Sequence, residues 1–87
     1  MEKNTEVKII VTGAFGLIGR ETVNSLTRSG YQPLCVELDT PENRLAASEY
    51  ENKAGLRTVF LDITNEDEVH QTLLTEQPEI IIHLAML

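Results

Sequence analysis

Three glycines stand three residues apart between a predicted strand and a predicted helix, in the segment 12–19 (TGAFGLIG). The β-branched run over residues 7–11 predicts a buried strand, and the apolar spacing after it predicts a helix over residues 16–29. A helix that begins directly after a glycine-rich turn presents free backbone N–H groups and the positive end of its dipole, which together attract phosphate. We therefore expect this segment to bind the pyrophosphate of a dinucleotide.

Each of the three glycines has its own expected task. Gly13 lets the chain turn sharply off the strand, and Gly16 has no Cβ, so a pyrophosphate can approach the backbone. Gly19 lets the helix pack close to the strand. The spacing is G-x-x-G-x-x-G, whereas the common dinucleotide fingerprint is G-x-G-x-x-G.

The rest of the chain alternates apolar runs with helical stretches. Strands are predicted over residues 34–38, 57–61 and 79–84, and helices over residues 41–53 and 66–77. Asn65 should accept a hydrogen bond from the backbone of Glu68, whose side chain should reach back to complete a capping box. The order β-α-β-α-β-α-β over residues 1–87 predicts one α/β domain: a Rossmann-type parallel sheet with strand order 3-2-1-4, an incomplete doubly wound fold.

Charge and cysteine content exclude several classes of partner. The chain has 14 acidic and 7 basic residues and a formal net charge of −7, which argues against nucleic acid and anionic membranes as partners. Cys35 is the single cysteine, so we expect no internal disulfide, a cytoplasmic setting and a buried, inert thiol. The two histidines have no Cys or Asp at metal-ligand spacing, so we expect no metal site, and His83 reads as a packed core residue.

The glycine segment and two later motifs resemble those of a known family. VTGAFGLIG resembles the T-G-x-x-G-x-x-G signature of extended short-chain dehydrogenases/reductases, the NAD-dependent epimerase/dehydratase family. Asp62-Ile63 resembles the pair that contacts the adenine in that family, and residues 78–85 (PEIIIHLA) resemble its fourth strand. Met86 differs, because the family commonly has a second alanine there. The resemblance implies a dinucleotide site formed by Gly13, Phe15, Gly16, Leu17, Ile18, Gly19, Glu37, Asp39, Asp62, Ile63, Leu84 and Ala85.

The end of the second predicted strand offers two acids that could select the cofactor. An acid there hydrogen-bonds the adenosine ribose and repels a 2′-phosphate, so either one implies NAD in preference to NADP. Glu37 and Asp39 are two residues apart and should point to the same side of the strand. Counting from Gly30 favours Glu37, whereas the Leu38-Asp39 pair favours Asp39; we prefer Glu37, with Asp39 as the alternative. Arg44 reads as a solvated helix residue that does not meet a phosphate.

The resemblance also implies an oxidoreductase whose catalytic Tyr-x-x-x-Lys pair lies after a fifth strand. Neither Tyr31 nor Tyr50 is followed by lysine at that spacing, so we expect no catalytic residue here. The expected function is that of the NAD-binding N-terminal portion of an epimerase/dehydratase-type enzyme, without its catalytic half and substrate domain. The alternative is a stand-alone, non-catalytic module that binds a dinucleotide or a partner. The fourth strand should be a bare apolar edge that permits self-association.

Overall fold

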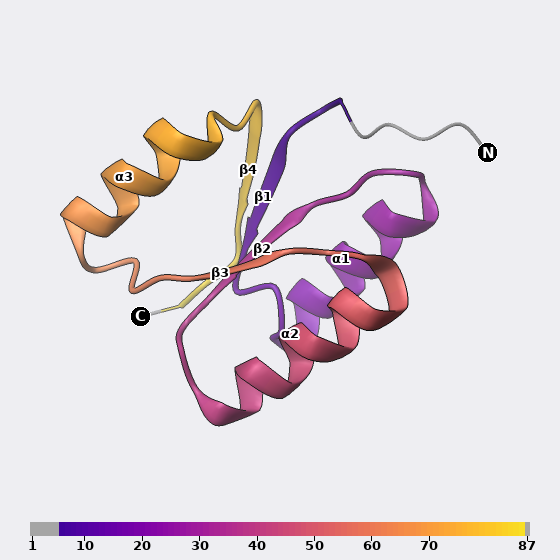
Figure 1. Cartoon of the computed structure of the whole chain (residues 1–87). Coiled ribbons are helices and arrows are strands. Elements are labelled where there is room, and N and C mark those ends of the chain that lie inside the picture. Colours follow the sequence, from indigo (N-terminus) through magenta and orange to yellow (C-terminus); the bar gives the residue numbers. More distant parts are fainter. Residues whose placement is uncertain (1–5, 87) are drawn as a thin grey trace.

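Strands and helices alternate along the chain in the computed structural model, which describes residues 6–86 (Figure 1). The strands are β1 (Ile9–Thr12), β2 (Leu34–Glu37), β3 (Thr58–Phe60) and β4 (Ile80–His83). The helices are α1 (Leu17–Arg28), α2 (Pro41–Ala54) and α3 (Glu66–Glu76). All strand pairs are parallel and the order is β3-β2-β1-β4, so the predicted Rossmann-type α/β topology is confirmed.

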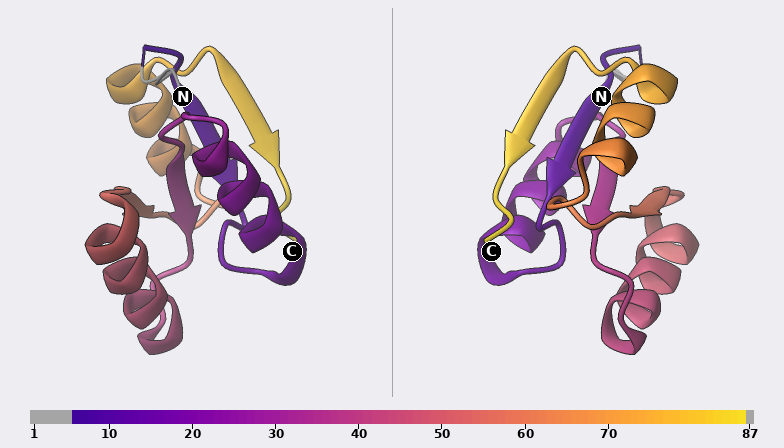
Figure 2. Two further views of the ribbon diagram at one scale, coloured as in Figure 1. Left: turned by 90° about the vertical axis from the view of Figure 1, so that its right-hand side faces the viewer. Right: turned by 90° about the vertical axis from the view of Figure 1, so that its left-hand side faces the viewer.

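The sheet separates α1 and α2 on one face from α3 on the other (Figures 1 and 2). Successive strand residues point to opposite faces, and the core divides accordingly. Ile9, Val11 and Cys35 belong to the buried cluster on the side of α1 and α2. Ile10 and Val36 belong to the second cluster, against which Val69 of α3 packs. The thiol of Cys35 is therefore buried, as expected, and its burial raises its pKa to about 12.

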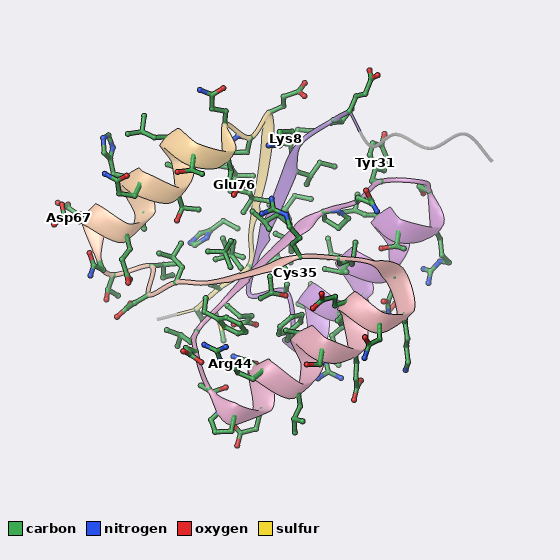
Figure 3. The ribbon with its side chains drawn as sticks, viewed as in Figure 1. Lys8, Tyr31, Cys35, Arg44, Asp67 and Glu76 are labelled. Atoms are coloured by element: carbon green, nitrogen blue, oxygen red, sulfur yellow. The ribbon has the colours of Figure 1, made fainter. Side chains whose placement is uncertain are left out.

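The second strand is one residue shorter than predicted, and this separates the two candidate acids. β2 ends at Glu37, and Asp39 lies in the loop that leads into α2. Asp39 there forms a bidentate ion pair with Arg44, with both N–O distances at 2.7 Å (Figure 3). The expectation that Glu37 and Asp39 share one strand face is therefore wrong, because the chain turns after Glu37 to begin the helix.

The start of α3 confirms one half of the predicted capping box. The side-chain Oδ1 of Asn65 accepts a hydrogen bond from the N–H of Glu68 at 3.2 Å. The reciprocal half is wrong, because Glu68 reaches past Asn65 and accepts from the N–H of Asp62 at 3.2 Å. The N–H of Asn65 instead donates to the carbonyl of Asp62 at 2.9 Å. The carboxylate of Glu68 thus holds the loop between β3 and α3 to the helix.

The far end of α3 is fixed by charge. Glu76 accepts from Arg57 at 2.6 Å and lies 3.9 Å from the ammonium of Lys8 (Figure 3). Glu76 is only 12% exposed, so its carboxylate is paired where solvent screening is reduced. These contacts tie α3 to the beginnings of β1 and β3.

β4 is an edge strand, as Figure 2 shows, and within residues 6–86 no element pairs with its outer side. Ile80 is 45% and Ile81 50% exposed. His83 is exposed as well, so the expectation that it is a packed core residue is wrong. Its Nδ1 instead lies 2.7 Å from the hydroxyl of Thr12.

No helix in residues 6–86 combines the length and the apolar character that a membrane crossing needs.

Candidate functional site

A cleft of about 480 Å³ lies at the carboxyl ends of the strands, where ligands bind in open parallel sheets. Loops that follow all four strands contribute to it. The lining residues are Gly13, Gly16, Val36, Glu37, Leu38, Leu61, Asp62, Ile63, Thr64, Leu84, Ala85 and Met86. The structure therefore brings together seven of the twelve predicted site residues: Gly13, Gly16, Glu37, Asp62, Ile63, Leu84 and Ala85.

Gly13 makes the turn off β1 in a left-handed conformation, with φ of 65°. Its N–H donates to the carbonyl of Val36 at 3.0 Å, which joins the loop to β2. A Cβ at Gly13 would lie 2.8 Å from the backbone nitrogen of Ala85. The glycine is thus required both by the backbone angle and by the close approach of the chain after β4.

Gly16 and Gly19 have opposite surroundings. A Cβ at Gly19 would lie 1.9 Å from the carbonyl oxygen of Gly13, so only glycine lets α1 approach the loop this closely. A Cβ at Gly16 would meet nothing nearer than that same oxygen at 3.5 Å. Gly16 therefore has no packing reason to be glycine, and it lines the cleft.

The N-terminus of α1 differs from those of the other helices in residues 6–86. Thr40 caps α2 and Asn65 caps α3 through side-chain oxygens, and both helices carry acids in the first turn. α1 begins after Gly16 with no side-chain cap and with no acid in its first turn. Its first N–H groups therefore lack a side-chain acceptor, and its dipole end lacks a compensating negative charge.

Glu37 faces the glycine loop from the end of β2. Its Oε2 accepts from the N–H of Phe15 at 2.9 Å, and its Oε1 accepts from the N–H of Leu38 at 3.3 Å. A carboxylate has about four lone-pair sites, so both oxygens keep capacity for further donors. Glu37 also lines the cleft.

Asp39 is not among the residues that line the cleft, and its carboxylate pairs with Arg44. The Arg44 guanidinium beside it holds the pKa of the Asp39 carboxyl below its usual range. The same guanidinium lies over the ring of Phe60, 4.4 Å from the ring centre. Arg44 is exposed, as expected, but it is fixed between an acid and an aromatic ring.

The loop after β3 forms the floor of the cleft. The carboxylate of Asp62 accepts from both the hydroxyl and the N–H of Thr64, at 2.6 and 2.9 Å. These two hydrogen bonds lower the pKa of Asp62. The carboxylate is thereby held charged in a compact turn, with Ile63 beside it in the cleft wall.

Five predicted site residues lie outside the cleft lining. The Phe15 side chain is buried in the core, Gly19 is covered by the loop, and Asp39 pairs with Arg44. Leu17 and Ile18 are exposed, at 87% and 68%, in the first turn of α1. Nε of Arg20, also in α1, donates to the carbonyl of Phe15 at 2.9 Å.

Sequence reasoning missed four residues of the cleft, which are Val36, Leu38, Leu61 and Thr64. Each lies at the end of β2 or β3 or just beyond it. Because ligands bind at the carboxyl ends of parallel strands, the predicted strand ends could have identified these residues. Met86 was singled out only as a departure from the family pattern, and it too lines the cleft.

A smaller cavity of about 180 Å³ opens at the amino ends of β1, β2 and β3. Two of its charged side chains, Lys8 and Arg57, both pair with the third, Glu76. In the part of the chain that the structure describes, no three His, Cys, Asp or Glu side chains cluster as metal ligands would.

Comparisons with known proteins agree with this geometry. The model of the NAD dependent epimerase/dehydratase family matches residues 9–87. UDP-glucose 4-epimerase of Dictyostelium discoideum is 33% identical over 80 residues, which make up 90% of this chain and 23% of that protein.

Solved structures show the same fold. UDP-glucose 4-epimerase from Bifidobacterium longum, in complex with NAD+ and UDP, has a TM-score of 0.75 and 23% identity, over 93% of this chain and 25% of that one. dTDP-glucose 4,6-dehydratase from Bacillus anthracis, in complex with NAD, has a TM-score of 0.74 and 20% identity, over 93% and 27%. This chain thus spans about a quarter of the length of these relatives. Because the family model matches nearly the whole sequence, the chain belongs to the NAD-dependent epimerase/dehydratase family.

Proposed function

We propose that the cleft at the carboxyl ends of the strands binds NAD, with its pyrophosphate against the N-terminus of α1. The observation that carries this proposal is that α1 has neither a side-chain cap nor a first-turn acid, and begins at an open glycine. A pyrophosphate would accept from the free N–H groups of the first turn and compensate the helix dipole. Leu17 and Ile18 would contribute through their backbone rather than their side chains.

The adenosine half would lie across β2 and β3. We propose Glu37 as the acceptor of the ribose hydroxyls, because it lines the cleft while Asp39 is held by Arg44. The negative charge of Glu37 would repel a 2′-phosphate, which favours NAD over NADP. Leu38 and Ile63 offer apolar surface for the adenine, and Leu84 and Ala85 form the opposite wall.

We further propose that the chain acts within a longer epimerase/dehydratase-type oxidoreductase of the cytoplasm. The relatives that it matches are about four times as long, and the free, buried Cys35 fits a reducing compartment. Sequencing of the gene beyond the codon for Leu87, together with the intact mass of the native product, tests this. A downstream Tyr-x-x-x-Lys pair supports the enzyme, whereas a stop codon after Leu87 leaves a non-catalytic dinucleotide-binding module.

Titration calorimetry with NAD and NADP tests the cofactor site directly. Glu37→Gln removes the negative charge of the side chain that would accept hydrogen bonds from the ribose hydroxyls. It should weaken NAD binding about tenfold and reduce the preference for NAD over NADP. Asp39→Asn is the matched control, because it removes the neighbouring acid that pairs with Arg44. Its NAD affinity should stay within about twofold of the unaltered chain.

Two results would contradict the assignment. Equal affinity of the unaltered chain for NAD and NADP removes the role of the acid. An Asp39→Asn variant that loses the preference while Glu37→Gln keeps it transfers that role to Asp39.

A further inference from the structure

The glycine loop between β1 and α1, residues 13–16, contains one large side chain, Phe15, and that side chain is almost completely buried. It leaves the cleft and enters the core cluster between the sheet, α1 and α2. Its ring stacks on the ring of Tyr50 from α2, with the ring centres 5.6 Å apart and the planes 7° from parallel. A loop residue is thereby anchored to a helix that begins four residues after Glu37.

The backbone of Phe15 is fixed on both sides as well. Its N–H donates to Oε2 of Glu37 at 2.9 Å, and its carbonyl accepts from Nε of Arg20 at 2.9 Å. With the ring held by Tyr50, the direction of the N–H bond is determined. The carboxylate of Glu37 is held by this donor at one oxygen and by the more distant N–H of Leu38, at 3.3 Å, at the other.

Tyr50 is itself tied to α1, because its hydroxyl donates to Oδ1 of Asn24 at 3.2 Å. The contacts therefore connect the end of β2 to α2 in two ways. One is the chain itself between Glu37 and α2, and the other runs from the Glu37 carboxylate to the Phe15 amide and through the stacked Phe15 and Tyr50 rings. Ala46 is the one buried residue of α2, and of the partly buried α2 residues that pack against the same core, Ala47, Tyr50 and Ala54, Tyr50 has the largest side chain.

We propose that Tyr50, through its stack with Phe15, is a positioning residue that sets the Glu37 carboxylate for the adenosine ribose and so sustains the preference for NAD over NADP. This inference rests on the proposed function of the cleft. It assigns to a residue outside the cleft a part in cofactor selection. Neither side chain of the stack touches the cofactor in this arrangement.

Hydrogen exchange of the ligand-free chain tests the placement. The N–H of Phe15 should exchange slowly, and the N–H of Cys35, bonded to the carbonyl of Arg57 at 3.0 Å, serves as an internal reference for global opening. In Tyr50→Leu, the Phe15 amide should exchange about five to ten times faster relative to the Cys35 amide. Tyr50→Phe keeps the ring and removes only the bond to Asn24, so its ratio should stay within about twofold.

A merely structural role for Tyr50 would speed both amides in parallel, and that result overturns the proposal. An equal change of the ratio in Tyr50→Phe also overturns it, because the hydroxyl and not the stack would then be responsible. Where Tyr50→Leu does not fold, Phe15→Leu removes the stack from the other side. A Phe15 amide that exchanges as fast as an exposed loop amide in the unaltered chain overturns the proposal without any variant.

Calorimetry supplies the functional readout. The ratio of NADP to NAD dissociation constants should fall about fivefold in Tyr50→Leu and remain unchanged in Tyr50→Phe. If the unaltered chain binds no NAD, the proposed function fails, and hydrogen exchange still judges the placement by Tyr50. If it binds NAD and the ratio is the same in Tyr50→Leu, only the role of Tyr50 fails.

Discussion

At the scale of single residues, Gly16 lies open to the cleft, whereas Gly19 is packed tightly against the loop after β1. Gly19→Ala places a Cβ 1.9 Å from a backbone oxygen, and the backbone cannot move away cheaply. We expect the free energy of unfolding to fall by about 3 kcal/mol, measured by urea denaturation. Gly16→Ala meets no such contact, so the free energy of unfolding should fall by no more than about 1 kcal/mol.

Although Gly16→Ala should change the stability little, we expect it to weaken NAD binding strongly. Its new methyl group would occupy the space through which the pyrophosphate approaches, and affinity should fall at least about tenfold in calorimetry at a temperature where the variant is folded. A Gly16→Ala variant with unchanged affinity would contradict the placement of the pyrophosphate.

Because the Cys35 thiol is buried, we expect the free energy of unfolding to fall as the pH rises above 9. The thiol of the unfolded chain ionises near its ordinary value of 9.0, whereas burial raises the pKa of the folded thiol to about 12. Below pH 9 both states hold the proton, and stability from this group is constant. Above pH 9 the unfolded thiol loses its proton while the folded one keeps it, so stability should fall by about 1 kcal/mol from pH 9 to 10 and by about 1.4 kcal/mol per pH unit beyond that.

Urea unfolding at pH 7, 9 and 10 measures this slope, with Cys35→Ala as the control that lacks the thiol. If the free energy of unfolding falls equally between pH 9 and 10 in Cys35→Ala, groups other than the Cys35 thiol cause the decrease. The native thiol should also resist a thiol reagent at pH 8 that labels the unfolded chain rapidly.

At the scale of elements, hydrophobic periodicity predicted every strand and helix in the correct order. The errors concern element ends, where side chains compete with the pattern. β2 ends at Glu37 because the chain turns there towards Thr40, the N-cap of α2. Asp39, in this turn, forms an ion pair with Arg44. Glu68 accepts from Asp62 rather than Asn65, because the backbone of Asn65 already donates within the turn. Such local competition is decided by three-dimensional distances that the sequence does not show.

Gln77 ends α3 in a conformation that favours glycine. Its φ is 48°, in the left-handed region, where residues with a Cβ are strained. Gln77→Gly should raise the free energy of unfolding by about 0.5–1 kcal/mol, because relief of strain exceeds the added entropy of the unfolded chain. Urea denaturation measures the change.

Gly55 provides the matched reverse substitution at the end of α2. Its φ is 67°, and Gly55→Ala should lower the free energy of unfolding by about 1 kcal/mol. A loss of stability in Gln77→Gly would show that contacts of the glutamine side chain outweigh the backbone strain.

At the scale of the whole molecule, burial depends on which elements are neighbours in space. The sequence predicted the strand order, in which β4 is an edge strand within residues 6–86, and seven of the residues expected at the cofactor site line one cleft. It failed for His83, since an apolar strand pattern looks the same at an edge and in the middle of a sheet. Phe15 shows the same limit, because nothing local predicts that a loop side chain enters the core to meet Tyr50.

The open edge of β4 has a consequence for the state of the chain in solution. Within residues 6–86 no strand pairs with the outer side of β4, and Ile80 and Ile81 there are each about half exposed, so we expect this edge to permit strand pairing between copies. We expect the apparent mass in sedimentation to rise with protein concentration. Ile81→Lys should suppress that rise, because a charged side chain on an edge strand must be desolvated when a second strand pairs.

Leu45→Lys is the matched control, since Leu45 is 70% exposed on α2, away from the edge. A chain that stays monomeric at about 100 μM, or equal suppression by both substitutions, would show that β4 is not where copies meet.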